Sequence, residues 1–211
     1  LHVLGDAKFL GRLDGVDGVT TRIGQPQDLR FGVLRLQQEG REVRGVQRMA
    51  HRANLTTKNM KLAGLLIFIS DIHSMGLRNT EGLQFTTSWY WDLNDDTRKF
   101  AARYFEKTKR MPGEIQAADY SATMTYLKAV AAAKTTDADK VMAELKKMKI
   151  DDFFGKGQIR ADGRYVHDMY LMEVKKPSES TKPWDYYKMV KKLPGEAVFT
   201  TKAESKCQHW K

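Results

Sequence analysis

Two polar residues that could bind a charged ligand follow directly after the longest apolar run of the chain. The run is Leu62–Ile69, and an unbroken apolar run of this length predicts a strand buried on both faces. The next segment, which contains Ser70, Asp71 and His73, predicts a polar loop at the carboxyl end of that strand. Ligands of open α/β sheets bind at this edge, so ligand contact is one interpretation. The other is that Asp71 caps a helix and His73 is a surface residue.

Three consecutive aromatic residues, Trp89, Tyr90 and Trp91, end a second predicted strand, Leu83–Trp91. Neighbouring side chains of a strand point to opposite faces, so at least one of the three packs in the core. Another could line an apolar pocket with its polar tip. We expect these aromatic residues to lie near the polar loop that contains Asp71.

No motif of catalysis or metal binding accompanies these residues. Catalysis would need a nucleophile or a second titratable partner at a known spacing, and nothing local supplies one. The five histidines lack His-x-x-x-His and His-Glu-x-x-His spacing, which argues against a metal site. The single cysteine, Cys207, excludes an internal disulfide and a cysteine-based zinc site. The residues favour a binding module without a cofactor over an enzyme.

The elements that would position these residues alternate between strands and helices. Residues 95–97 are typical of a helix start, and Pro112-Gly113 ends that helix. An alanine-rich helix is predicted from about Glu114 to Ala133 and contains Tyr120, a residue type that usually packs in the core there. A third helix starts at Asp137.

After the third predicted helix, the spacing of apolar residues becomes typical of strands. Gln158–Arg160 and Tyr165–Val174 flank an Asp-Gly turn at 161–164, which predicts a hairpin. Few polar residues interrupt Tyr165–Val174, so we expect a well-covered strand. Together the elements predict an α/β fold with a layered sheet and flanking helices.

The composition is that of a soluble chain that can fill a core. The chain has 211 residues, 41% of them hydrophobic, and a formal net charge of +10. No apolar run reaches the ~18 residues of a transmembrane helix. The first residues show no signal-peptide pattern and no initiator Met, so we expect a processed or truncated chain. The basic residues are scattered, which is typical of a solvated surface; a nucleic-acid or membrane footprint is the alternative.

The first 60 residues differ in composition from the rest. They contain eight Arg and two Lys, against six Arg and twenty Lys in residues 61–211, and they hold two of the 21 aromatic residues. Leu29, Val33 and Leu36 have helical spacing, and so do Val43, Val46 and Met49. We therefore separate residues 1–58, as a divergent small domain or an out-of-frame translation, from residues 59–211.

Residues 59–211 resemble a known family, the periplasmic substrate-binding proteins of ABC transporters, in the branched-chain amino acid (type I) group. The similar segments, in the order in which the family has them, are Lys61–Ser74, Gly82–Asp92, Ala117–Ala122, Phe154–Arg164, Met169–Lys175 and the ending from Lys182 to Cys207. A full-length member is longer, and most of its first lobe has no counterpart here.

The resemblance implies two α/β lobes joined by three crossing strands, with the ligand in the cleft between them. It implies a periplasmic protein that captures a small hydrophobic or aromatic amino acid or carboxylate and delivers it to an inner-membrane permease. Asp71 stands where family members bind the ammonium group of the ligand, with Ser70 and His73 beside it. Trp89, Tyr90 and Trp91 fall where the chain enters the cleft, and Tyr120 lies at a cleft-facing helix start.

Two other classes of function remain open at this point. One is an α/β enzyme, a hydrolase or transferase, that uses Asp71 and His73. The other is a basic nucleic-acid-binding module, which the net charge of +10 motivates. The resemblance implies no nucleic-acid partner and no cofactor.

Overall fold

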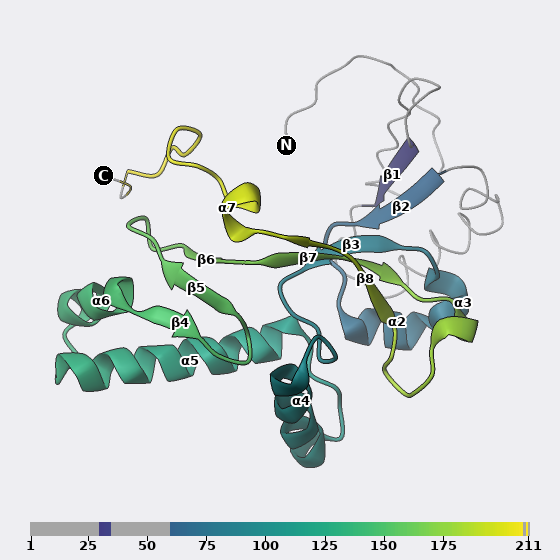
Figure 1. Ribbon diagram of the computed structural model, residues 1–211, viewed down its shortest axis with the longest axis horizontal. Coiled ribbons are helices and arrows are strands. Elements are labelled where there is room, and N and C mark those ends of the chain that lie inside the picture. Colours follow the sequence, from purple (N-terminus) through teal and green to yellow (C-terminus); the bar gives the residue numbers. More distant parts are fainter. Residues whose placement is uncertain (1–29, 35–59, 209, 211) are drawn as a thin grey trace, which may run out of the picture. The chain divides into compact units, whose positions relative to one another are not determined.

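The computed structural model describes residues 30–34, 60–208 and 210 (Figure 1). Its strands are β1 (Arg30–Leu34), β2 (Met60–Gly64), β3 (Gln84–Thr87), β4 (Lys149–Asp151), β5 (Lys156–Ile159), β6 (Tyr165–His167), β7 (Met169–Val174) and β8 (Tyr187–Leu193). Its α-helices are α2 (Ile69–Met75), α3 (Leu77–Thr80), α4 (Asp95–Thr108), α5 (Glu114–Ala133), α6 (Ala138–Lys147) and α7 (Gly195–Val198). A 3₁₀ turn, η2, covers Pro177–Glu179. The mixed α/β class predicted from the sequence is confirmed.

The chain divides into two compact units. Unit 1 holds the described residues up to Ile67 together with Asp71–Phe85 and Glu173–Lys188. Unit 2 holds Phe68–Ser70, Thr86–Met172 and the residues from Met189 onward. Strands β3, β7 and β8 each contain a boundary between the units, so the chain passes from one unit to the other three times within a strand.

The larger sheet has the strand order β1-β2-β3-β7-β8. β1 pairs parallel with β2, with Arg30 opposite Met60, and β2 pairs parallel with β3. Strands β3 and β7 are joined by hydrogen bonds from Gly82 N to Val174 O (3.0 Å) and from Val174 N to Leu83 O (2.9 Å). The second sheet, β4-β5-β6, is antiparallel.

The Glu173 carboxylate on β7 links four strands of the larger sheet. It accepts hydrogen bonds from Gln84 Nε2 on β3 (2.8 Å) and Lys61 Nζ on β2 (2.8 Å), and it pairs with Lys188 Nζ on β8 (3.1 Å). Burial raises the pKa of this carboxyl group, but the donors from Lys61, Gln84 and Lys188 outweigh that effect and lower the pKa to about 2. Glu173 is therefore ionised in the folded protein at neutral pH.

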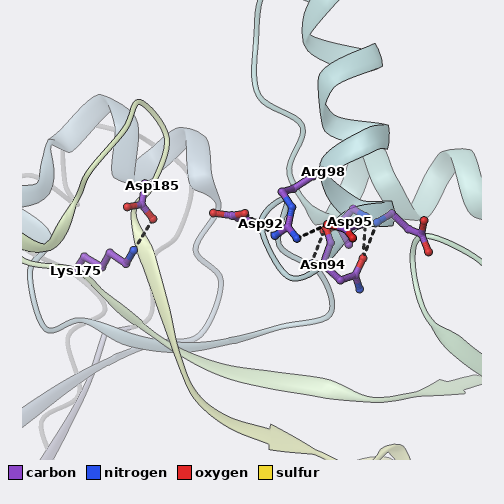
Figure 2. A network of polar contacts seen from close by, with 8 residues as sticks. Asp92, Asn94, Asp95, Arg98, Lys175 and Asp185 are labelled. Atoms are coloured by element: carbon purple, nitrogen blue, oxygen red, sulfur yellow. Dashed lines mark hydrogen bonds and ion pairs between the residues drawn. The ribbon is translucent and has the colours of Figure 1, made fainter.

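Capping residues determine where helices of unit 2 begin. Asn94 caps α4: its side chain accepts from Asp96 N and Thr97 N, both at 3.0 Å, and Arg98 bridges Asp92 and Asp95 beside it (Figure 2). These bonds satisfy amide groups that the first helical turn leaves without partners. The predicted start of this helix at residues 95–97 is confirmed.

The other two predicted helices are also confirmed. α5 spans Glu114–Ala133, the bounds expected from the sequence. Asp137 caps α6 by accepting from Lys140 N at 3.0 Å. Both α4 and α5 end at a lysine in the left-handed region, with φ of 56° at Lys109 and 53° at Lys134, a common way to end a helix.

The predicted hairpin at the Asp-Gly turn is confirmed as β5 and β6. Gly163, with φ of +83°, closes the turn, and Ile159 pairs with Tyr165. The prediction of one strand over Tyr165–Val174 is wrong, because the segment forms β6 and β7 in two different sheets with a break at Asp168. Its residues are nevertheless all covered, and Met172 and Val174 are each 1% exposed, as expected.

The strand predicted over Leu62–Ile69 is wrong in its second half. β2 ends at Gly64, and helix α2 begins at Ile69. Continuous hydrophobicity does not distinguish a strand from a turn followed by a helix. Ile72 and Met75 continue a helical spacing of buried residues from Ile69. Asp71 and its neighbours therefore stand in a helix, not in a loop.

Two more predictions of secondary structure need correction. The strand expected over Leu83–Trp91 ends at Thr87, so the three aromatic residues follow it outside regular structure. The helix expected from Leu29, Val33 and Leu36 is instead strand β1 over Arg30–Leu34, because a parallel partner strand is available and Gly32 weakens a helix. The helix expected from Val43, Val46 and Met49 lies outside the described residues.

We predict that Glu173→Gln lowers the free energy of unfolding by roughly 2–3 kcal/mol at pH 7. The folded-state pKa of about 2 is below the usual 4.5. Ionised Glu173 therefore stabilises the fold above about pH 5, and this contribution is lost as the pH falls toward 2. Urea unfolding at several pH values should show the difference from the unsubstituted protein shrinking over this range.

The control variant is Glu81→Gln, a carboxyl group on a partly exposed residue of unit 1. It should change the free energy of unfolding by less than about 0.5 kcal/mol. A Glu173→Gln effect that equals this control, or one that does not change between pH 7 and pH 3, would contradict the stabilising role of Glu173.

Candidate functional site

The predicted polar residues Ser70, Asp71 and His73 lie on helix α2. Asp71 stands in its first turn and is partly buried, and Ser70 and His73 are exposed. A carboxylate in the first turn interacts favourably with the positive end of the helix dipole. His73 is therefore a surface residue, as one interpretation of the sequence expected. That interpretation did not include the contacts that its ring makes.

The ring of His73 stacks on Trp184, with centroids 3.9 Å apart and planes at 15°. His73 Nδ1 and the hydroxyl of Tyr186 lie 2.7 Å apart and share a hydrogen bond. Trp184 has φ of +67°, a conformation that is uncommon for a bulky residue and costs conformational energy. We call His73, Trp184 and Tyr186 the His73 cluster. Its ring stacking and its hydrogen bond offset the conformational energy that Trp184 costs.

A buried carboxylate supports the loop that carries Trp184 and Tyr186. Asp185 is 3% exposed, is ion-paired with Lys175 (Figure 2), and accepts from Thr181 N (3.0 Å) and Thr181 Oγ1 (3.2 Å). Burial raises the pKa of Asp185, but the donors from Lys175 and Thr181 outweigh it, and the net effect is a lowered pKa. A paired buried charge of this kind fixes the loop, because breaking the pair would leave a charge without a partner.

The predicted aromatic residues of unit 2 contribute mainly to its core. Trp89, Tyr90 and Trp91 are 2%, 5% and 9% exposed. Trp89 donates its indole N–H to Phe153 O at 3.1 Å, so its polar atom is used inside the unit. For Trp89 the core interpretation holds.

Phe100 lies at the centre of the aromatic packing in unit 2. Its ring stacks on Phe153 at 4.1 Å and 14°, and it meets Trp89 at 5.9 Å and Tyr120 at 5.4 Å edge-on. Tyr120 is 44% exposed, and the Arg103 guanidinium carbon lies 5.8 Å from its ring centre. Tyr120 therefore packs on the core with one face and meets solvent with the rest.

A cavity of about 310 Å³ opens beside the Phe100–Phe153 stack. Its other lining residues are charged, namely Asp96, Lys99, Arg103, Asp151 and Asp152. A volume near 300 Å³ is at the lower end for small-ligand sites. A lining of two aromatic rings with both cations and carboxylates could hold an aromatic ring together with a carboxylate or an ammonium group.

Glu114, which the sequence analysis did not single out, organises the exit of β3. Its Oε2 accepts from Thr87 Oγ1 (2.6 Å), Ser88 N (2.8 Å) and Ser88 Oγ (3.0 Å). The available signal was a carboxylate at the first position of a long helix directly after Pro112-Gly113. Its partners from a strand end 26 residues earlier cannot be read from local spacing.

The structure places the predicted site residues in two groups. Asp71 and His73 belong to unit 1, whereas Ser70, Trp89, Tyr90, Trp91 and Tyr120 belong to unit 2. Their assembly into one ligand site stays a prediction. Among the described residues no group of three or more His, Cys, Asp or Glu side chains could hold a metal ion, and no helix is long and apolar enough to cross a membrane.

We predict that Glu114→Ala lowers the free energy of unfolding by about 1–2 kcal/mol, because it leaves the Ser88 amide without its acceptor and removes one of the two acceptors of the buried Thr87 hydroxyl, which keeps Trp89 O. Thr123→Ala, an exposed position of α5, is the control and should stay within about 0.5 kcal/mol. Urea unfolding followed by tryptophan fluorescence measures both. Equal effects of the two variants would refute the role of Glu114.

The chain is similar to known proteins of the same α/β class. A family model described as periplasmic binding protein matches residues 37–181. This match begins inside the segment 1–58 that its composition sets apart, and the origin of that segment stays a prediction. No curated protein matches the chain.

Solved structures match with high similarity. A periplasmic binding protein from Burkholderia mallei is 58% identical with a TM-score of 0.76, over 83% of this chain and 46% of that one. A branched chain amino acid ABC transporter periplasmic ligand-binding protein from Burkholderia xenovorans LB400 is 37% identical with a TM-score of 0.78, over 86% and 48%.

A third structure shares the fold at 18% identity and a TM-score of 0.60, over 73% of this chain and 42% of that one. It is a solute binding protein of an ABC transporter from Rhodopseudomonas palustris BisB5 in complex with 3,4-dihydroxy benzoic acid. The chain thus spans about half the length of the structures that it matches. With the resemblance of its motifs confirmed by the family match and by these identities, the chain belongs to the periplasmic binding proteins, a family of binding proteins and not of enzymes.

Proposed function

We propose that the protein acts as part of the solute-binding component of an ABC importer in the periplasm, where it captures a small hydrophobic or aromatic amino acid or carboxylate for an inner-membrane permease. The observation that carries this proposal is the 58% identity to the Burkholderia mallei periplasmic binding protein over 83% of the chain. The 37% identical relative is described as a branched chain amino acid transporter component, which supports an importer of amino acids or similar acids.

The proposal assigns Asp71 to the ammonium group of an amino acid ligand. Asp71 lies in the first turn of α2, partly buried, and the resemblance gives this position an acidic residue. Ser70 precedes Asp71 in the chain and supplies a hydroxyl group. The His73 cluster supplies an imidazole group from His73 and a phenol group from Tyr186. A carboxylate beside hydrogen-bonding side chains suits a cationic group more than a phosphate or a nucleic acid.

Aromatic and basic groups of unit 2 support a carboxylate ligand with an apolar body. The cavity lined by Phe100 and Phe153 also contains the cations Lys99 and Arg103 beside three carboxylates, from Asp96, Asp151 and Asp152. Arginine is well suited to carboxylates because its planar guanidinium can donate two parallel hydrogen bonds. Tyr120, on the edge of this packing, is 44% exposed, more than Trp89, Tyr90 or Trp91.

A thermal-shift panel tests the proposal. We predict that leucine, isoleucine or phenylalanine, or an aromatic acid such as benzoate or 3,4-dihydroxybenzoate, raises the unfolding temperature. A ligand at 100 times its Kd contributes about 2.7 kcal/mol of stability. If amino acids bind, Asp71→Asn should abolish their effect, while acids that lack an ammonium group should keep theirs.

The matched control is Asp139→Asn, which removes an exposed carboxylate from the first turn of α6. It should leave all ligand responses unchanged. No response to any acid, together with salt-dependent retention on DNA, would contradict the proposal and favour a nucleic-acid-binding module.

A further inference from the structure

Arg103 is the charged residue of the unit 2 cavity whose side chain has no carboxylate partner in the described part of the chain. Its contacts are with Tyr120: Nη2 lies 3.5 Å from the tyrosine hydroxyl oxygen, and the guanidinium carbon lies 5.8 Å from the ring centre. Arg103 lines the cavity together with the rings of Phe100 and Phe153. An arginine in this position can pair with an anionic group that a ligand brings.

Two of the three carboxylates of the cavity are paired with lysines. Asp96 Oδ1 lies 3.5 Å from Lys99 Nζ, and Asp151 Oδ2 lies 2.9 Å from Lys156 Nζ. All four side chains are more than half exposed, so each pair adds little to stability. The charges of these four residues nevertheless cancel in pairs.

The third carboxylate, that of Asp152, is held by donors of the protein itself. Its Oδ2 accepts from Ser121 Oγ at 2.6 Å, and its Oδ1 accepts from Phe154 N at 2.8 Å and from Gly155 N at 3.3 Å. A carboxylate with three such donors is stabilised without a ligand cation. The cavity therefore offers a ligand the N–H donors of Arg103 more than it offers an acceptor.

Tyr120 places the guanidinium of Arg103 beside the aromatic rings of the cavity. The Tyr120 ring meets Phe100 at 5.4 Å and Phe153 at 5.7 Å edge-on, and those two rings stack on each other at 4.1 Å. Arg103 lies against the same tyrosine ring, within the ~6 Å over which a cation and an aromatic ring attract each other. A positive charge and an aromatic surface are thus close together before a ligand binds, which lowers the entropy cost of binding.

We infer that the cavity of unit 2 binds aromatic carboxylates that lack an ammonium group, and that Arg103 determines this specificity. The guanidinium donates to the two carboxylate oxygens of the ligand, a pairing that its planar shape favours. The ligand ring packs on the aromatic lining. An ammonium group on the same ligand would lose its hydration beside carboxylates that already have partners. This inference rests on the proposed function and deepens it, because it gives the cavity a ligand class that does not involve Asp71.

A phosphate suits the cavity less well than a carboxylate does. The lining contains three acidic residues and two basic ones. A phosphate group carries about two negative charges at neutral pH, so the acidic residues repel it more strongly than they repel a carboxylate with a single charge. The aromatic rings also favour a ligand with an apolar body.

Calorimetric titration of the full chain with 3-phenylpropanoate and with phenylalanine tests the inference, because the two acids differ only in the ammonium group. Arg103→Gln should weaken the binding of 3-phenylpropanoate at least about tenfold, which corresponds to ~1.4 kcal/mol. The reason is that the variant removes the charge and the paired donors that hold the carboxylate. The same variant should change any binding of phenylalanine by less than about twofold.

The matched control is Arg110→Gln, which removes an exposed arginine just beyond the end of α4 and outside the cavity lining. It should change the affinity for 3-phenylpropanoate by less than about twofold. Arg103 is itself exposed, and glutamine has a helix propensity close to that of arginine. Both variants should therefore keep the unfolding temperature of the unsubstituted chain, so that a loss of binding does not reflect a loss of fold.

The outcomes separate this inference from the proposed function. If acids bind but Arg103→Gln has no larger effect than Arg110→Gln, or if it weakens both acids equally, this inference is overturned and the proposed function stands. If the chain binds neither these two acids nor any other amino or aromatic acid, the proposed function is contradicted and this inference is overturned with it.

Discussion

The Glu173 carboxylate is the interaction on which the larger sheet depends. It lies on β7 with a 12% exposed side chain and is surrounded by donors from β2, β3 and β8. Donors from two lysines and one amide offset the free-energy cost of burying one negative charge. A network with one donor missing would be less stable than an apolar contact at the same place. β3, β7 and β8 are also the strands along which the chain passes between its units. The same ion cluster therefore fixes the strands that connect the His73 cluster of unit 1 to the aromatic core of unit 2 along the chain.

Different interactions position the candidate residues in the two units. In unit 1, the buried Asp185 holds the loop whose Trp184 and Tyr186 meet His73. In unit 2, stacking between Phe100 and Phe153 forms the floor of the cavity, and the Trp89 indole is tied to the backbone of Phe153. Both sets of contacts fix side chains in the absence of ligand, which reduces the entropy that ligand binding must offset.

The sequence predicted best those elements whose signals are local. Residues 95–97 and Asp137 mark helix starts and Pro112-Gly113 marks a break, through signals that act within a few residues, and α4, α5 and α6 agree with them. It failed where tertiary pairing decides: β1 forms because β2 is beside it, and Leu62–Ile69 divides at Gly64 into a strand end and a helix start. Glu114 and Glu173 were missed because their partners lie 15 to 112 residues away. The family resemblance came from the order of several modest motifs, which no single residue would have provided.

The central claim is that this chain contributes to the capture of a small acid. Native mass spectrometry of the protein, isolated under mild conditions without added ligand, tests it most directly. The account predicts a noncovalent adduct with the mass of an amino acid or an aromatic carboxylic acid, which exchanges when a competing acid of the same class is added. A spectrum that shows nucleotides or nucleic acid in place of such an acid, or no adduct even after incubation with the full set of acids, would contradict it.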